Sequence, residues 1–239
     1  MTNRIVTDYW DNEFKLGEPI INLPCFRLFS NADLDEDYAM TWLKYDEVNL
    51  FSSSPILIEK FNLKNNPPTS HQELLARLAQ ANINWYGTDQ VFYLSENKRE
   101  KLQHESFPSI VRRLTGSDKT IFDEFCTQNS DDDLDGAYVE LDHWCVMGLF
   151  EKEKLVAIAS AYPWDTSLLA DMGILTHPHY RQQGYAKVLI KALSKFILNE
   201  GYEPQYRCQL DNVSSLMLAK KAGFSPFAQL DFILNTDDK

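Results

Sequence analysis

The sequence predicts a mixed α/β (α+β) protein, in which a central mixed sheet with flanking helices follows a smaller α/β region. In the second half of the chain, apolar runs of strand length alternate with helical periodicity. At 239 residues, with 44% apolar and 24% charged residues, the chain can bury a core of globular size. A change of pattern before Pro108 predicts two domains, at residues 1–105 and 106–239.

Turn-forming residues divide residues 1–105 into short elements. Ser70 and Glu73 form a capping-box pattern ahead of an apolar helical face, which predicts the start of a helix. Further elements expected in this region are a helix at 34–45, strands at 56–58 and 91–94, and a helix or linker at 96–105. No residue constellation here indicates chemistry, and we expect this domain to pack against the second one and to shape a site there.

Residues 106–239 show a more regular order of apolar patterns. We expect strands at 110–114, 144–150, 155–162, 168–176, 205–210 and 228–234, and helices capped by Ser117, at 185–198 and at 214–222. The strands at 144–150 and 155–162 are expected to form a hairpin. Asp171 and Gly173 interrupt the apolar strand at 168–176, which indicates a β-bulge or a place where another segment approaches the backbone.

Composition limits the partners and the compartment. A net charge of −12 argues against a nucleic acid or an anionic membrane surface, and it fits a cationic small molecule or peptide better. No run approaches the ~18 apolar residues of a membrane span, and the N-terminus lacks the apolar region of a signal peptide, so we expect a cytoplasmic protein. The four cysteines are scattered without metal-site spacing, so we expect no metal, and three of them lie in apolar patterns that favour buried thiols.

The turn between the strand at 168–176 and the helix at 185–198 is the most informative segment. Its sequence is Arg181-Gln-Gln-Gly184-Tyr-Ala186. A glycine turn at a helix N-terminus leaves several backbone N–H groups pointing outward, which suits a phosphate or pyrophosphate. A glycine in this position also serves as a plain turn device. Beside a strand that could pair with an extended, amide-bearing ligand, the turn predicts a ligand such as coenzyme A.

These residues resemble a known family. Arg181-x-x-Gly184-x-Ala186 after the strand is similar to the acyl-CoA signature of the GNAT N-acetyltransferase superfamily. The later run from Asn212 to Gly223-Phe224 resembles its second signature, in which an Asn ends a strand and a helix closes with Gly-Phe. The expected order of elements matches the family fold across about residues 107–236 and leaves the first hundred residues outside it.

The resemblance implies acetyl-CoA as donor and direct attack of a primary amine on the thioester. The catalytic residues that it suggests are Asp171 as general base, Ser215 as hydrogen-bond donor to the thiolate, and Asn212. The CoA-binding residues that it suggests are Ile174, Leu175, Thr176, Arg181, Gln182, Gln183, Gly184, Tyr185, Ala186, Asn212 and Ser215. Because a lysine-like amine is almost entirely protonated at pH 7, a base or a water chain must remove its proton.

One position departs from the family pattern. Many relatives carry a Tyr seven residues after the Asn, but here that residue is Ala219. Ser215 is the best substitute, since some branches use a Ser there to bind the sulfur. A local cluster that caps the helix explains Ser214 and Ser215 equally well.

Several other residues carry two interpretations each. Asp171 is either a base or a satisfied bulge residue, and Arg181 either contacts phosphate or braces the turn. His177, His179 and the pair Asp142-His143 are further possible bases, although solvated turn histidines are favoured for the first two. The acidic run 131–135 is a rim for a cationic amine or, more simply, a solvated loop, and Trp144, Tyr162 and Trp164 line an acceptor pocket or pack in the core.

Two functions of other classes stay open beside an N-acetyltransferase. One is a non-catalytic acyl-CoA-binding sensor or interaction module, an alternative that the missing Tyr leaves open. The other is an interaction domain that binds no CoA. The sequence leaves open the acceptor amine, the acyl group and the oligomeric state.

Overall fold

The computed structural model describes residues 3–235 and divides them into two units. The first comprises residues 3–6, 92–207 and 213–225, and the second comprises residues 7–91, 208–212 and 226–235. The expected boundary between residues 105 and 106 falls within the first unit of this division. Whether residues 1–105 and 106–239 form domains with separate roles stays a prediction.

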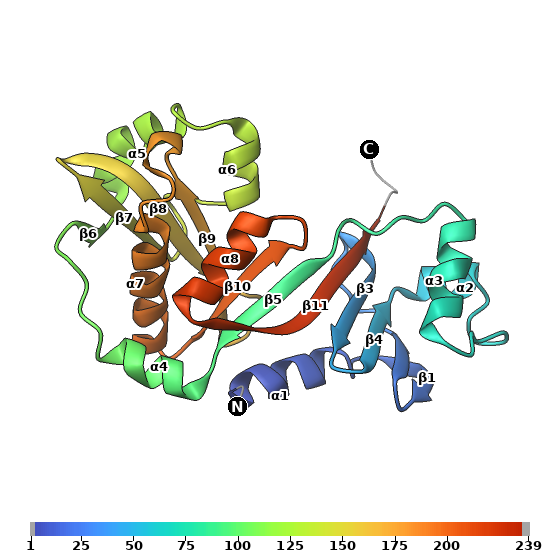
Figure 1. The fold of residues 1–239 in the computed structure, drawn as a ribbon. Coiled ribbons are helices and arrows are strands. Elements are labelled where there is room, and N and C mark those ends of the chain that lie inside the picture. The colour runs from blue at the N-terminus through green and yellow to red at the C-terminus, as the bar shows by residue number, and fades with distance from the viewer. Residues whose placement is uncertain (1–2, 236–239) are drawn as a thin grey trace. The chain divides into compact units, whose positions relative to one another are not determined.

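A mixed sheet with strand order β5-β10-β9-β8-β7-β6 forms the first unit (Figure 1). Its strands are the second half of β5 (Asp89–Leu94), β6 (Val111–Arg113), β7 (Cys145–Glu151), β8 (Lys154–Pro163), β9 (Leu169–Thr176) and most of β10 (Glu203–Gln209). β7 and β8 form the expected hairpin, whereas β9 pairs antiparallel with β8 and parallel with β10. The predicted fold class, a mixed sheet with flanking helices, is confirmed.

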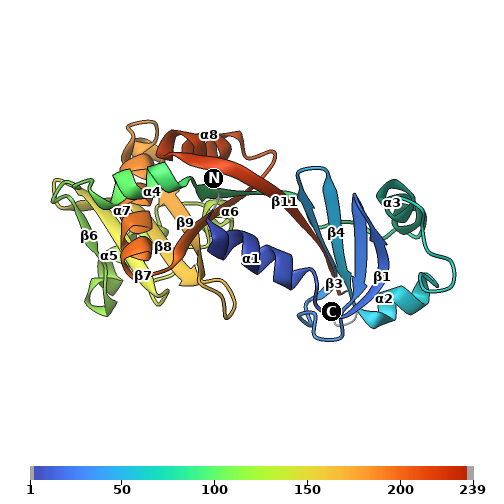
Figure 2. The ribbon, with the colours of Figure 1, turned by 90° about the horizontal axis from the view of Figure 1, so that it is seen from below.

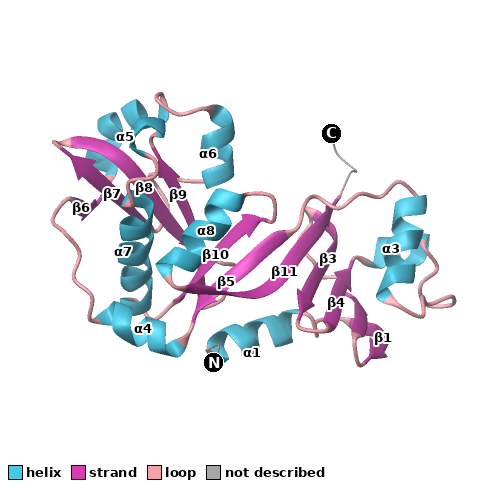
Figure 3. Cartoon of the chain, in the orientation of Figure 1, coloured by secondary structure: helices cyan, strands magenta, loops and turns pink. Residues whose placement is uncertain are grey.

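Helices lie on both faces of this sheet (Figure 3). They are α4 (Glu96–Gln103), α5 (Lys119–Cys126), α6 (Asp131–Ala137), α7 (Tyr185–Asn199) and α8 (Val213–Ala222). Because side chains alternate along a strand, Ile158 of β8 and Leu175 of β9 pack with Phe125 of α5, whereas Met172 points to the other face and contacts Ser194 of α7. The two faces therefore pack against different helices, with α7 on one face and α5 on the other.

The second unit has its own strand order, β1-β2-β4-β3-β11. Its strands are β1 (Glu18–Leu23), β2 (Phe26–Ser30), β3 (Tyr38–Tyr45), β4 (Val48–Ser53) and most of β11 (Phe224–Leu234), and its helices are most of α1 (Arg4–Glu13), α2 (Pro55–Lys60) and α3 (His71–Gln80). α2 and α3 lie beside these strands (Figure 2) and supply Leu57, Ile58, Leu74 and Leu78 to a shared apolar core.

Two expected elements of this unit are wrong. The segment expected as a helix at 34–45 contains strand β3, because Trp42 stacks on Phe51 of β4 at 5.5 Å and the strand pairs on both sides. Tertiary pairing here overrides a local helical pattern. The strand expected at 56–58 is helix α2, which begins with Ser54 as N-cap and Pro55 in the first turn.

The predicted cap of α3 is confirmed, with one change of partner. The Ser70 hydroxyl accepts a hydrogen bond from the Glu73 amide at 3.2 Å. The Glu73 carboxylate accepts from the amide of Thr69 at 2.8 Å, one residue before the cap, and from Arg77. These bonds lower the pKa of Glu73 to about 2.

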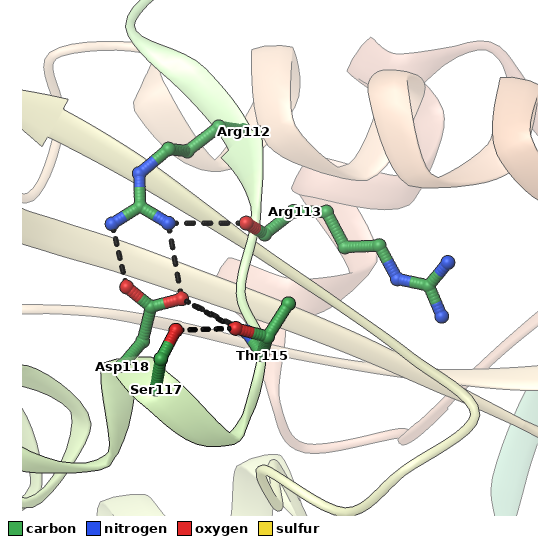
Figure 4. A network of polar contacts seen from close by, with 5 residues as sticks. All are labelled: Arg112, Arg113, Thr115, Ser117 and Asp118. Carbon is green, nitrogen blue, oxygen red and sulfur yellow. Dashed lines mark hydrogen bonds and ion pairs between the residues drawn. The ribbon is translucent and has the colours of Figure 1, made fainter.

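The start of α5 is held by a different residue from the one expected. A 3-10 turn (Gly116–Asp118) precedes α5, and Thr115 with Asp118 forms a capping box around it. Arg112 donates two hydrogen bonds to the Asp118 carboxylate and Ser117 bonds only with Thr115, whereas Arg113 points away (Figure 4). Ser117 is therefore a member of the network and not the helix cap.

Candidate active site

Strands β9 and β10 lie side by side over only part of their length. Their parallel pairing runs from Leu169 opposite Glu203 to Met172 opposite Tyr206. β9 continues to Thr176, still paired with β8, while its register with β10 ends at Met172. The backbone of residues 173–176 therefore has a strand neighbour on one side, as expected for a strand edge that pairs with an extended ligand.

Gly173 marks the point where the two strands part. No register shift interrupts the pairing of β9 with β8, so the expected β-bulge at Asp171 and Gly173 is wrong. The alternative, a close approach of another segment, is confirmed, because a Cβ on Gly173 would lie 2.1 Å from the carbonyl oxygen of Ala137 and 2.8 Å from that of Tyr138. Glycine is required here because the end of α6 rests on the strand.

Thr176, with its side-chain hydroxyl, ends the strand edge. Among the residues described, its buried hydroxyl oxygen has no hydrogen-bond partner. Of its predicted neighbours, Leu175 is buried in the core with α5, and Ile174 is partly buried on the opposite face of the strand. An unsatisfied buried hydroxyl costs about 1–3 kcal/mol, so Thr176 is suited to a ligand that would bond with it.

The glycine turn, residues 181–186, has the backbone form that the sequence suggested. Gln182 and Gly184 both have positive φ, 62° and 85°, and α7 starts directly after Gly184 with no capping side chain. A Cβ on Gly184 would meet nothing within 4 Å. The first amides of α7 thus have no side-chain cap, and the space beside Gly184 is open, an arrangement suited to phosphate.

Side chains of the glycine turn bond mainly with the protein itself. Arg181 donates to the Thr176 carbonyl at 3.1 Å and forms an ion pair of 2.9 Å with Asp133 of α6. Tyr185 donates to Glu151 at 2.8 Å, and Gln183 reaches the carbonyl of His179 at 3.5 Å. Arg181 therefore braces the turn, and any CoA contact in this segment would fall mainly to backbone groups.

His177 is buried, so the expectation of a solvated turn histidine is wrong for this residue. Its side chain contacts Gln128 through Nε2 at 3.0 Å, and its Nδ1 accepts from the amide of His179 at 3.2 Å. Burial lowers the pKa of His177, with Lys154 adding to the effect. The bond accepted at Nδ1 requires a neutral ring, so His177 pins the segment before the glycine turn.

Asp171 lies in a buried polar cluster on the face of the sheet that bears α5. Its carboxylate forms an ion pair with Arg207 at 2.9 Å and accepts from Tyr162 at 3.1 Å and from Gln205 at 3.3 Å. The guanidinium of Arg207 stacks over Trp164 at 4.3 Å. Both carboxylate oxygens are engaged, and the predicted role of Asp171 as a base stays a prediction.

Ser215 and Tyr206 form a hydroxyl pair that the sequence did not suggest. The two side-chain oxygens are 2.7 Å apart, and Tyr206 is buried. Tyr206 stands opposite Met172, at the last rung before β9 and β10 part. The position of the family Tyr, Ala219, is buried in α8. The tyrosine hydroxyl beside Ser215 thus comes from strand β10 and not from helix α8. Only the pairing register of β10 could have revealed this contact.

Asn212 belongs to the second unit, where its amide donates to the carbonyl of Gln209 at 3.1 Å. Its predicted part in CoA binding and catalysis stays a prediction. The hydrogen bond closes the turn that follows β10, which is a structural role of its own.

The acidic run 131–135 is helical, so the expectation of a loop is wrong. Ser130 caps α6 by accepting from the Asp133 amide at 3.2 Å, and acidic residues in a first helical turn are stabilised by the helix dipole. Tyr138 ends α6 in the left-handed region, and its ring contacts those of His143 and Tyr162. Trp144 instead packs on Phe196 and Tyr202, on the α7 side.

Comparisons with known proteins agree with this geometry. Residues 117–224 match the model of the Acetyltransferase (GNAT) family. An acetyltransferase of the GNAT family from Colwellia psychrerythraea is 17% identical over 98% of both chains, with a TM-score of 0.54. A structure assigned to the same family from Novosphingobium aromaticivorans is 18% identical over 65% of this chain and 68% of that one, with a TM-score of 0.51. At these identities the two structures show a shared fold.

Over residues 117–224 the chain is therefore similar to GNAT acetyltransferases. A search of curated proteins finds no match. Within residues 3–235, no helix combines the length and the apolar character needed to cross a membrane. In the same range, His, Cys, Asp and Glu nowhere gather in groups of three or more that could hold a metal ion.

Proposed function

We propose that the protein transfers an acetyl group from acetyl-CoA to a cationic primary amine, on a small molecule or a peptide, by direct attack. The parting of β9 from β10 after Met172, in the strand that leads into the glycine turn, is the observation that carries this proposal. An edge of strand beside an uncapped helix N-terminus suits a ligand with amides at one end and phosphates at the other.

CoA would be held mainly by backbone groups. We assign its pantetheine amides to residues 174–176 and its pyrophosphate to the amides of residues 182–186. Two features support this assignment. Among the residues described, the buried Thr176 hydroxyl has no hydrogen-bond partner, which is unfavourable without a ligand, and no protein atom fills the space beside Gly184. Arg181 would complement the phosphate charge only if it left Asp133.

The leaving thiolate would be met by the hydroxyl pair of Ser215 and Tyr206. A serine hydroxyl is a weak acid, so Ser215 alone would stabilise the thiolate by hydrogen bonding. Tyr206, 2.7 Å away, supplies a more acidic hydroxyl in contact with it. The pair thereby offers a substitute for the tyrosine that Ala219 replaces.

The acceptor would enter on the α6 side of the sheet. The acidic first turn of α6 favours a cationic amine, since a carboxylate-rich rim raises the local concentration of cations. The predicted contribution of residues 1–105 to this side, and a cytoplasmic location, remain predictions.

Calorimetric titration with acetyl-CoA and with CoA tests the donor site. Release of free thiol in the presence of spermidine, a lysine peptide or an aminoglycoside tests the transfer. We expect binding of both nucleotides and amine-dependent thiol release. Absence of binding at millimolar acetyl-CoA contradicts the donor assignment, whereas binding without thiol release with any amine favours an acyl-CoA sensor.

A further inference from the structure

We propose that His143 is the group that takes the proton from the attacking amine, and that Ser160 is the positioning residue that orients its ring. This inference rests on the proposed acetyl transfer and names the base for it. His143 lies just before β7, and Ser160 lies on β8 next to it.

A single hydrogen bond fixes the imidazole. The Nδ1 atom of His143 is 2.8 Å from the Ser160 hydroxyl, which is fully buried. Ser160 stands directly opposite Gly173 in the pairing of β8 with β9. The ring is thus anchored at the rung where β9 starts to run without β10, which is the part of the sheet assigned to the acyl donor.

Two tyrosines enclose the same ring. Tyr138 lies edge-on to His143 at 5.1 Å and Tyr162 lies at 4.9 Å, and the His143 side chain is only 9% exposed. The carbonyl of Tyr138 is also one of the two groups that approach Gly173. His143, the end of α6 and the strand edge therefore meet at one place.

The charges around His143 suit a base at neutral pH. Burial lowers the pKa of His143, and the carboxylates of Glu140 and Asp142 oppose this effect only partly. Among the residues described, the other titratable side chains whose rings contact that of His143 are Tyr138 and Tyr162, and Tyr162 donates a hydrogen bond to Asp171. The imidazole is consequently neutral near pH 7 and able to accept a proton.

The tautomer decides which nitrogen accepts it. If Nδ1 carries the hydrogen and donates it to Ser160, the lone pair of Nε2 is left for the amine. The nearest carboxylate oxygen, on Glu140, is 3.8 Å from Nε2, too far for a hydrogen bond but near enough to stabilise an imidazolium. Glu140 is half exposed, so the proton has a route to water.

Asp171 is less suited to the same task. Three protein donors already occupy its two oxygens, and one of them is the cationic Arg207. A proton on this carboxylate would weaken its ion pair with Arg207. Its position instead holds Tyr162, which in turn packs on His143.

The proton balance closes without another reactant. His143 Nε2 takes one proton from the ammonium group, the amine nitrogen forms a bond to the acetyl carbon, and the carbon–sulfur bond breaks. The second ammonium proton leaves the nitrogen as the amide forms and accounts for the thiol hydrogen, delivered through Ser215 or water. His143 then releases its proton to solvent.

Nitrogen NMR of the histidine-labelled full chain at pH 7.5 tests the tautomer without any acceptor. We expect His143 to carry its hydrogen on Nδ1, with Nε2 unprotonated, assigned by loss of the signal in His143→Gln. A hydrogen on Nε2 overturns the proposal, because no lone pair would then face away from Ser160.

Kinetics of thiol release with the most active amine of the panel test the role. His143→Gln is expected to lower kcat at pH 7 about 100-fold and to leave the KM for acetyl-CoA within about 2-fold. In the wild type, kcat should increase with pH below pH 6.5 as His143 loses its proton, and this pH dependence should disappear in the variant. Ser160→Ala should lower kcat about 5-fold, in line with the loss of one neutral hydrogen bond. His104→Gln, at an exposed histidine after α4, is the matched control and should not change kcat.

The outcomes separate this proposal from the acetyl transfer itself. An active wild type with an unchanged pH profile in His143→Gln overturns the base and leaves the transfer standing. A wild type that binds acetyl-CoA and releases no thiol with any amine overturns both.

Discussion

The two halves of strand β9 differ in what their polar groups contact. In the first half, up to Met172, the strand pairs on both sides, and the buried carboxylate of Asp171 is bound by Arg207, Tyr162 and Gln205. In the second half, from Gly173 to Thr176, the register with β10 has ended and the Thr176 hydroxyl has no partner among the residues described.

This difference separates stability from ligand binding within eight residues. Groups whose bonds are complete inside the protein contribute to the fold, and removing one partner is costly. Buried polar groups without a hydrogen-bond partner lower the stability of the protein unless a ligand bonds with them. Three substitutions and one change of pH test this division.

Asp171→Asn should have the largest effect, because it removes the buried negative charge that pairs with Arg207. We expect the free energy of unfolding, measured with urea, to fall by about 3 kcal/mol. The control is Asp123→Asn, which breaks the exposed pair with Lys119 and should change stability by less than about 0.5 kcal/mol. Equal effects of the two substitutions would mean that the first half of β9 is not held by this pair.

Gly184→Glu should abolish most CoA binding, since it places bulk and negative charge at the assigned pyrophosphate site. A loss of about 100-fold in affinity by calorimetry is expected, equivalent to about 2.7 kcal/mol. Gly201→Glu is the matched control, because Gly201 has the same φ of 85° and likewise no atom within 4 Å of its added Cβ. If both variants bind CoA equally well, the glycine turn does not hold the phosphates.

Thr176→Val should affect CoA binding without lowering the stability of the protein. The exchange removes an unpartnered hydroxyl at nearly constant volume, so stability should stay the same or rise by up to about 1 kcal/mol. CoA affinity should fall about 5-fold through the loss of one hydrogen bond. Ser52→Ala removes another unpartnered buried hydroxyl and should leave CoA affinity unchanged. A clear loss of stability in Thr176→Val would show that this hydroxyl is already bonded.

Acidification should have the smallest effect on stability, and it should act through His177, which holds the segment before the glycine turn. The pKa of His177 is lowered in the folded protein, so the unfolded chain takes up its proton first, and stability falls as pH drops below about 6.5. The expected loss is below about 1 kcal/mol. The fall in Tm between pH 7.5 and 5.5 should be smaller in His177→Gln than in the wild type and unchanged in His104→Gln, because His143, whose pKa is also lowered, keeps its own contribution. A Tm difference that is the same in all three proteins would exclude His177 as its source.

The sequence predicted best the segments whose local pattern and final partners agree. The helix after Gly184 and the hairpin of β7 and β8 follow directly from their periodicity. The prediction of a helix at 34–45 is wrong because Trp42 packs on Phe51 of the neighbouring strand. The prediction of a strand at 56–58 is wrong because Ser54 and Pro55 start a helix there, and this signal outweighs the short apolar run.

The candidate site was predictable to the extent that it is local. The glycine turn is one continuous segment, so its residues could be named from the chain. The contacts of His143 with Ser160 and of Tyr206 with Ser215 depend on strand register and on the packing of α8, which no single segment encodes. Gly173 was recognised as unusual, but the segment that approaches it was not identifiable.

Strand β6 closes one edge of the first unit in a way that limits how copies of the protein can associate. It is only three residues long, and two of them are arginines. Arg112 lies over the ring of Phe150 at 4.4 Å while bound to Asp118, and Arg113 lies over Phe196 at 5.3 Å. A short edge carrying two fixed cations offers little length for a further strand and repels an identical edge. The protein should therefore resist edge-to-edge aggregation at this side even when concentrated, and replacing both arginines with threonine should make it precipitate sooner.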